Sequence, residues 1–70
     1  MELDKSKAVR ILYTNYRGET ALRVVYPERI VFDATDWHPK EQWLLEAFDE
    51  DRNAIRLFAM KDIKAWLEME

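Results

Sequence analysis

The sequence predicts a small, mostly β domain that ends in a short helix. Apolar and polar residues alternate along most of the chain, short polar turns separate the alternating runs, and the spacing becomes helical near the C-terminus. The 70 residues leave room for one hydrophobic core. Residues 1–7 carry mixed charges without periodicity, so we interpret them as a flexible tail before a single domain over residues 8–70.

A β-hairpin is expected near the N-terminus. Apolar side chains lie at every second position from Val9 to Tyr13, and a similar alternation covers residues 19–26. The turn between them, residues 15–18, contains the only glycine of the chain, which suits a turn position with positive φ. Pro27 is expected to end the second strand, because proline cannot donate a hydrogen bond to a neighbouring strand.

Three more strands are expected, over residues 30–35, 42–49 and 54–58. The run at 42–49 is the strongest, and apolar residues at both parities indicate a strand buried on both sides. A loop at 36–40 precedes it. Asn53 closes the polar turn before the last strand, since asparagine tolerates left-handed backbone geometry.

The last part of the chain has the spacing of a helix. Ile63, Trp66 and Leu67 lie at i, i+3 and i+4, and Asp62 suits an N-cap. Five short strands, tight turns and one terminal helix are typical of a small SH3-like or Sm-like barrel, with the helix over an open end.

Composition excludes several kinds of site. Without cysteine the chain forms no disulfide and no thiolate zinc site, and one histidine cannot build a His-rich metal site. One glycine cannot supply a glycine-rich phosphate loop. Ser6 is the only serine, and no threonine lies in a catalytic motif. We therefore expect no enzymatic activity, no metal and no cofactor.

Charge and hydropathy bear on partners and location. The net charge is −3, and neither half of the chain is basic, which argues against an autonomous nucleic-acid binder with a basic stripe. No secretory signal begins the sequence, and no apolar run approaches the length of a membrane span. We expect a cytoplasmic protein that does not interact with membranes.

Arg23 and Arg56 are candidate binding residues on expected strands. Each lies between apolar neighbours, and an isolated charge costs several kcal/mol in an apolar environment. One interpretation is a salt bridge to a carboxylate, such as that of Asp33 or Glu46 in the case of Arg23. The other is a planar guanidinium fork for the phosphate or carboxylate of a ligand.

The aromatic candidates also have two interpretations each. Tyr13 is expected as a half-buried residue whose hydroxyl reaches water, an arginine or a ligand. Trp37 and His38 lie in a loop, where they either fold back over the barrel or bind a ligand. Trp43 either packs in the core or offers a stacking surface for a base.

An ordered set of residues resembles the WYL domain, a bacterial family named for a Trp-Tyr-Leu triplet on a strand. The resemblance spans residues 8–67, and residues 35–43 look like a compact, stand-alone branch of the family. The residues that carry it are Ile11-Leu12-Tyr13-Thr14-Asn15, Gly18-Glu19, Arg23, Pro27, Trp43-Leu44-Leu45-Glu46-Ala47-Phe48-Asp49, Arg56-Leu57-Phe58 and Asp62-Ile63.

The resemblance implies an Sm-like barrel that senses a ligand, often a nucleotide or single-stranded nucleic acid, and controls transcription. It implies ligand-contacting roles for Tyr13, Arg23 and Arg56. This sequence has Leu44 where the family has the tyrosine of the triplet. It has Ala59 and Asp62 where the family often has arginine.

Two hypotheses follow from these observations. The first is a ligand- or partner-binding sensor module that uses Tyr13, Arg23, Arg56, Trp37 and His38, with a nucleotide or short nucleic acid as ligand. The second is a structural or protein-interaction module that self-associates and binds no small molecule, because a small core with many aromatic residues and open strand edges favours pairing between chains.

Overall fold

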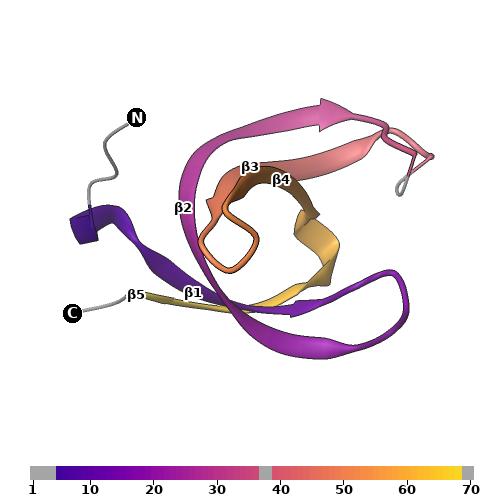
Figure 1. Ribbon diagram of the computed structural model, residues 1–70. Coiled ribbons are helices and arrows are strands. Elements are labelled where there is room, and N and C mark those ends of the chain that lie inside the picture. The colour runs from indigo at the N-terminus through magenta and orange to yellow at the C-terminus, as the bar shows by residue number, and fades with distance from the viewer. Residues whose placement is uncertain (1–4, 37–38, 69–70) are drawn as a thin grey trace.

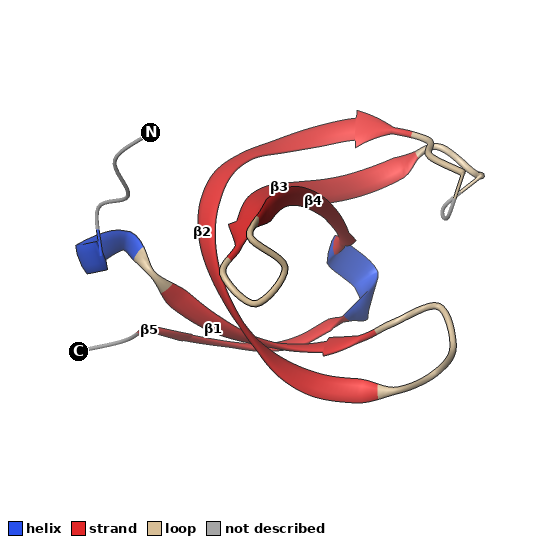
Figure 2. Cartoon of the chain, viewed as in Figure 1, coloured by secondary structure: helices blue, strands red, loops and turns tan. Residues whose placement is uncertain are grey.

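The computed structural model describes residues 5–36 and 39–68, which form one curved antiparallel sheet (Figures 1 and 2). A 3₁₀ turn, η1 (Lys5–Lys7), precedes the first strand, and a second one, η2 (Met60–Asp62), precedes the last. The five strands are β1 (Val9–Thr14), β2 (Thr20–Asp33), β3 (Gln42–Asp49), β4 (Ala54–Ala59) and β5 (Ile63–Glu68).

The strand order in the sheet is β4-β3-β2-β1-β5. The long strand β2 pairs with β1 along its first half and with β3 along its second half, and it curls around the core between them (Figure 1). β4 and β5 are the two edge strands, and no hydrogen-bonded ladder joins them in the described part of the chain. The mostly β prediction is therefore confirmed, whereas closure into a barrel is not.

The prediction that Pro27 ends a strand is wrong. β2 continues through Pro27 to Asp33, and the register with β3 shifts between Pro27 and Arg29. Pro27 still pairs with Ala47, and Glu28 is the residue left out of the ladder. Proline is found at such bulges, where the regular pairing is already interrupted. The bulge also bends the strand, so the two strands expected on either side of Pro27 are one continuous strand.

The prediction of a C-terminal helix is wrong as well. Only η2 is helical there, and the following residues form β5, which pairs with β1. The register shifts where Tyr13 pairs with Ile63 and Ile11 pairs with Trp66, so Ile63 and Trp66 face the same side despite their three-residue spacing. A bulge in a strand thus reproduced the spacing that indicates a helix face.

The hydrophobic core lies on one face of the curved sheet. Its buried members come from four strands and are Val9, Ile11, Tyr13, Val25, Leu45, Ala47 and Phe58. The strand at 42–49 is buried on both sides at Leu44 and Leu45, as expected, but Trp43 is 58% exposed. Trp43 lies at the far end of the β2–β3 ribbon, where its ring meets the edge of Phe32 at 5.2 Å.

The two tight turns are confirmed. Gly18 has φ of 80° in the β1–β2 turn, and Asn53 has φ of 53° in the β3–β4 turn. These are the left-handed geometries that favour glycine and asparagine. Each turn supplies one arginine, Arg17 or Arg52, to the lining of the same pocket.

Candidate functional site

An ion pair between Arg56 of β4 and Asp49 at the end of β3 anchors the candidate site. The Asp49 side chain is fully buried, and its Oδ2 accepts a hydrogen bond from Arg56 Nη1 at 3.0 Å. Its Oδ1 accepts hydrogen bonds from the backbone N–H of Asp51 (3.0 Å) and of Arg52 (3.4 Å) in the β3–β4 turn. A buried carboxylate requires such partners. Asp49 therefore shapes the turn and orients Arg56.

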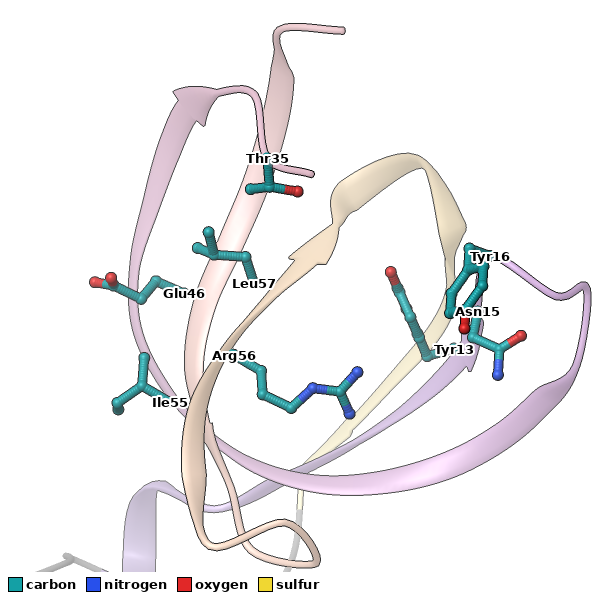
Figure 3. A pocket seen from close by; sticks show the side chains of 8 residues that line it. All are labelled: Tyr13, Asn15, Tyr16, Thr35, Glu46, Ile55, Arg56 and Leu57. Carbon is teal, nitrogen blue, oxygen red and sulfur yellow. The ribbon is translucent and has the colours of Figure 1, made fainter. Parts of the chain in front are cut away.

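Arg56 keeps most of its donors for other contacts. A guanidinium has five N–H donors, of which Asp49 takes one. The guanidinium carbon lies 5.2 Å from the centroid of the Phe58 ring, so the cation also rests on an aromatic face. Figure 3 shows the side chain extending from β4 toward Tyr13 across the open side of the sheet.

Tyr13 joins the end of β1 to β4. Its ring meets Phe58 edge to face at 5.0 Å, and its hydroxyl accepts a hydrogen bond from the Ala59 backbone N–H at 3.2 Å. Burial raises the pKa of the hydroxyl above the ordinary 10.0; the nearby Asp62 carboxylate also raises it, while the Ala59 hydrogen bond and Arg56 act in the opposite direction. Tyr13 is therefore neutral at physiological pH, and its proton remains available for donation.

A pocket of about 400 Å³ opens between β4 and the β1–β2 turn (Figure 3). Tyr13 and Arg56 line it together, and the side chains or main chain of six other residues complete it. These are Asn15, Tyr16, Thr35, Glu46, Ile55 and Leu57. Arg29 Nε lies 2.5 Å from Glu46 Oε2, so the negative charge of this pocket carboxylate is balanced by an ion pair.

A second pocket of about 550 Å³ adjoins the first and is lined by Tyr16, Arg17, Arg52 and Arg56. Its arginines come from three separate segments: the β1–β2 turn, the β3–β4 turn and β4. Neither Arg17 nor Arg52 forms an ion pair with another described residue. The two pockets share Tyr16 and Arg56, so they form one continuous surface with a cationic end.

Arg17 is held by its own turn. The Asn15 Oδ1 accepts hydrogen bonds from the backbone N–H of Arg17 (2.9 Å) and of Glu19 (3.0 Å), which is how asparagine stabilises tight turns. The Arg17 Nε donates to the Tyr16 hydroxyl at 3.2 Å, and this hydrogen bond raises the pKa of the guanidinium above its usual value. Arg17 is charged at every physiological pH.

Comparison with protein-family models gives a match to the WYL domain over residues 3–67 of the 70. The chain belongs to the WYL domain family. This confirms the resemblance carried by the residues around Trp43-Leu44-Leu45. WYL domains are generally ligand-binding regulatory domains. No curated protein and no solved structure matches the chain.

In this WYL domain the structure brings two of the five expected site residues together. Tyr13 and Arg56 line the same pocket. Arg23 pairs with Ile11 in the β1–β2 ladder and lines neither pocket. Trp37 and His38 lie outside the described residues.

Arg23 and Arg56 were each expected to form either a salt bridge or a ligand contact. Arg56 combines the two positions, because it forms a salt bridge to the buried Asp49 and also lines the pocket. The salt bridge expected for Arg23 with Asp33 or Glu46 does not form among the described residues, and Glu46 pairs with Arg29 instead. Tyr13 is more buried than expected, at 5% exposure, because the Phe58 ring covers it.

The sequence interpretation missed four residues that build this surface. Asp49, which is fully buried, was not among the candidate residues. Arg17, Arg52 and Tyr16 lie in the expected turns and were not candidates either. The signal that points to them is their position: each lies in or beside a turn that contains a left-handed residue, Gly18 or Asn53.

Two negative observations limit the chemistry of the described part of the WYL domain. Within residues 5–36 and 39–68, no three acidic, histidine or cysteine side chains are grouped to hold a metal ion. Neither 3₁₀ turn there has the length or apolar character that a membrane-crossing helix requires.

Proposed function

We propose that this WYL domain is a sensor module that binds a nucleotide-like or short single-stranded nucleic-acid ligand at its arginine-lined surface, without catalysis. The observation that supports the proposal is the convergence of Arg17, Arg52 and Arg56 on one pocket of a chain whose net charge is −3. An acidic protein that gathers three arginines in one place favours an anionic ligand there.

The chemistry of the surface suits phosphates joined to bases. The planar guanidinium binds phosphate oxygens through two parallel hydrogen bonds. Tyr16 is 61% exposed, and the Arg17 guanidinium carbon lies 5.6 Å from its ring centroid, so a stacking surface lies beside a cation. The Tyr13 hydroxyl adds a neutral donor at the inner end.

The family assignment supports the wider part of the proposal. In line with the resemblance, we place the sensing in transcription control in the bacterial cytoplasm, and we propose that the curved sheet is a variant of an Sm-like barrel. These extensions rest on the family, whereas the ligand class rests on the arginines.

Fluorescence anisotropy with a labelled oligothymidylate, competed with mononucleotides, tests the ligand class. Arg52→Ala and Arg17→Ala are expected to weaken binding about tenfold each, since a charge-assisted hydrogen bond contributes about 1.5–3 kcal/mol. For a single strand, each lost phosphate contact also lowers the slope of log K against log salt by about 0.7.

Arg10→Ala is the matched control. Arg10 is exposed on β1, and its neighbours Val9 and Ile11 face the core, so it lies on the opposite face of the sheet. Its loss changes the net charge equally and is expected to leave binding unchanged. An equal effect of Arg10→Ala, or no binding by the wild-type protein, would refute the proposed site.

A second candidate function is protein interaction through an exposed apolar cluster. Ile30, Phe32 and Trp43 share one face of the β2–β3 ribbon and are each more than half exposed. Contiguous apolar surface of this kind often marks an interface. If it joins two copies, native mass spectrometry detects a dimer at micromolar concentration that Trp43→Ala abolishes; a monomer would contradict self-association.

A further inference from the structure

The outer edge of β4 carries main-chain groups with which no described strand pairs. β4 pairs only with β3. The Ala59 N–H donates to the Tyr13 hydroxyl and therefore points away from β3. In an antiparallel strand successive residues direct their N–H and C=O groups to opposite edges. The N–H and C=O groups of Ile55 and Leu57 consequently point outward, as that of Ala59 does.

This edge forms one wall of the first pocket, the one of about 400 Å³. Ile55 and Leu57 both line it, and Asn15 and Tyr16 of the β1–β2 turn lie on its other side (Figure 3). The Tyr13 hydroxyl takes the outward N–H of Ala59, so the stretch of the edge that remains for pairing runs from Ile55 to Leu57. A strand pairs at about 4.8 Å from its neighbour and advances about 3.3 Å per residue, so three or four extended residues match the stretch from Ile55 to Leu57.

Positive charge near the Ile55 end of this edge selects the kind of segment that binds. The second pocket adjoins the first there and is lined by Arg17, Arg52 and Arg56, of which only Arg56 has a carboxylate partner among the described residues. A segment that pairs with the edge and carries an acidic residue beyond Ile55 would bring its carboxylate to Arg52 and Arg17.

We propose that the outer edge of β4 takes up an extended, acidic segment of a partner protein as a sixth strand. Main-chain hydrogen bonds to Ile55 and Leu57 supply affinity, and an acidic side chain on Arg52 and Arg17 supplies selectivity, as in other cases of strand addition to a sheet edge. The inference goes beyond the proposed ligand sensing, although both use the arginines. Strand addition also requires the outward main-chain groups of β4, which a nucleotide does not.

Peptide binding followed by NMR tests the proposal. The probes are two blocked hexapeptides of alternating valine and threonine, with a glutamate at either the N-terminal or the C-terminal end, because the direction of the added strand is open. With one of them, the amides of Ile55 and Leu57 are expected to gain protection from hydrogen exchange. The Arg56 amide, which already faces β3, is expected to change little.

N-methylated peptides give the decisive result without altering the protein. A strand at an edge uses every second N–H, so methylating one alternate set of amides is expected to abolish binding and methylating the other set to leave it intact. Replacing the glutamate by glutamine, or Arg52 by alanine, is expected to weaken binding about tenfold, and Arg10→Ala is expected to leave it unchanged.

Leu57→Pro tests the outward main-chain groups of β4 directly. The variant removes an outward N–H that does not belong to the β3–β4 ladder, which an edge strand tolerates. It is expected to lose the peptide. Anisotropy of oligothymidylate with the wild-type protein reports ligand sensing separately, so the two proposals can fail independently. Equal sensitivity to both methylated sets, protection at β5 instead of β4, or no binding of either peptide would overturn the proposal. Concentration-dependent protection of Ile55 and Leu57 without peptide would overturn it in favour of a second copy of the chain.

Discussion

Replacing Asp49 by alanine is the sharpest test of how this domain holds its candidate site. Asp49 is the only buried charged residue in the described part of the chain, and it accepts three hydrogen bonds. Alanine removes all three acceptors. The β3–β4 turn then loses its side-chain support, and the guanidinium of Arg56 loses the group that directs it.

The expected loss of stability is about 2–4 kcal/mol. Two backbone donors in exposed turn residues return to water at a cost of about 0.5–1.5 kcal/mol each, and the longer bond contributes least. Losing one partner of a fully buried pair costs about 3–5 kcal/mol, but the Arg56 side chain is 34% exposed and regains water, which reduces its share to about 1–2 kcal/mol. A core of this size supplies a net of about 3–5 kcal/mol, so most of it would be lost.

Urea unfolding followed by circular dichroism measures this loss. Asp49→Asn is the matched control, because it keeps Oδ1 as an acceptor for the turn while removing the charge. It is expected to cost about 1–2 kcal/mol, and Arg56→Ala combined with Asp49→Ala in a double-mutant cycle is expected to give a coupling of about 1 kcal/mol. A loss below about 0.5 kcal/mol for Asp49→Ala, which is the usual range for an ordinary surface substitution, would refute the reasoning.

Three further outcomes are expected. Because burial raises the pKa of Tyr13, this group leaves the folding stability unchanged below pH 10.0 and lowers it as the pH rises further. The Tyr13→Phe variant is expected to lack this alkaline fall when unfolding is measured as a function of pH. Identical pH profiles in the two proteins would contradict the burial effect. Gly18→Ala is expected to lower the free energy of unfolding in urea by about 1 kcal/mol. The backbone φ of 80° alone causes this loss, because no atom lies within 4 Å of the added Cβ. An unchanged urea midpoint would argue against the left-handed geometry. Asn53→Gly is expected to be neutral or stabilising in the same assay, since φ is 53° there, whereas Asn53→Val is expected to destabilise; the reverse order would be inconsistent with that turn.

Local patterning predicted most of the secondary structure. Strands β1, β3 and β4 and the two turns follow from alternation and from single glycine and asparagine residues. The failures lie where a ladder contains a bulge. At Pro27 a bulge let a strand pass a residue that ordinarily ends one, and beside Ile63 a bulge gave a strand the spacing of a helix. Periodicity assumes a regular repeat, so it cannot detect an irregularity imposed by the neighbouring strand.

The candidate site was predictable only in part. Tyr13 and Arg56 were found because polar groups among apolar strand residues need an explanation, and they line one pocket. Arg23 met the same criterion but lies elsewhere in the sheet. Nothing local distinguishes these arginines, because their surroundings depend on how the sheet curves.

The sequence by itself determined that this is a mostly β WYL domain with two left-handed turns and an apolar strand at Trp43-Leu44-Leu45, since these features depend on residues adjacent in the chain. Only the tertiary structure decided three features: no described strand pairs with the outer edge of β4, Asp49 is buried beneath Arg56, and arginines from three segments share one pocket. These depend on long-range pairing and curvature, which bring together groups far apart in sequence and set whether a charge meets water or a partner.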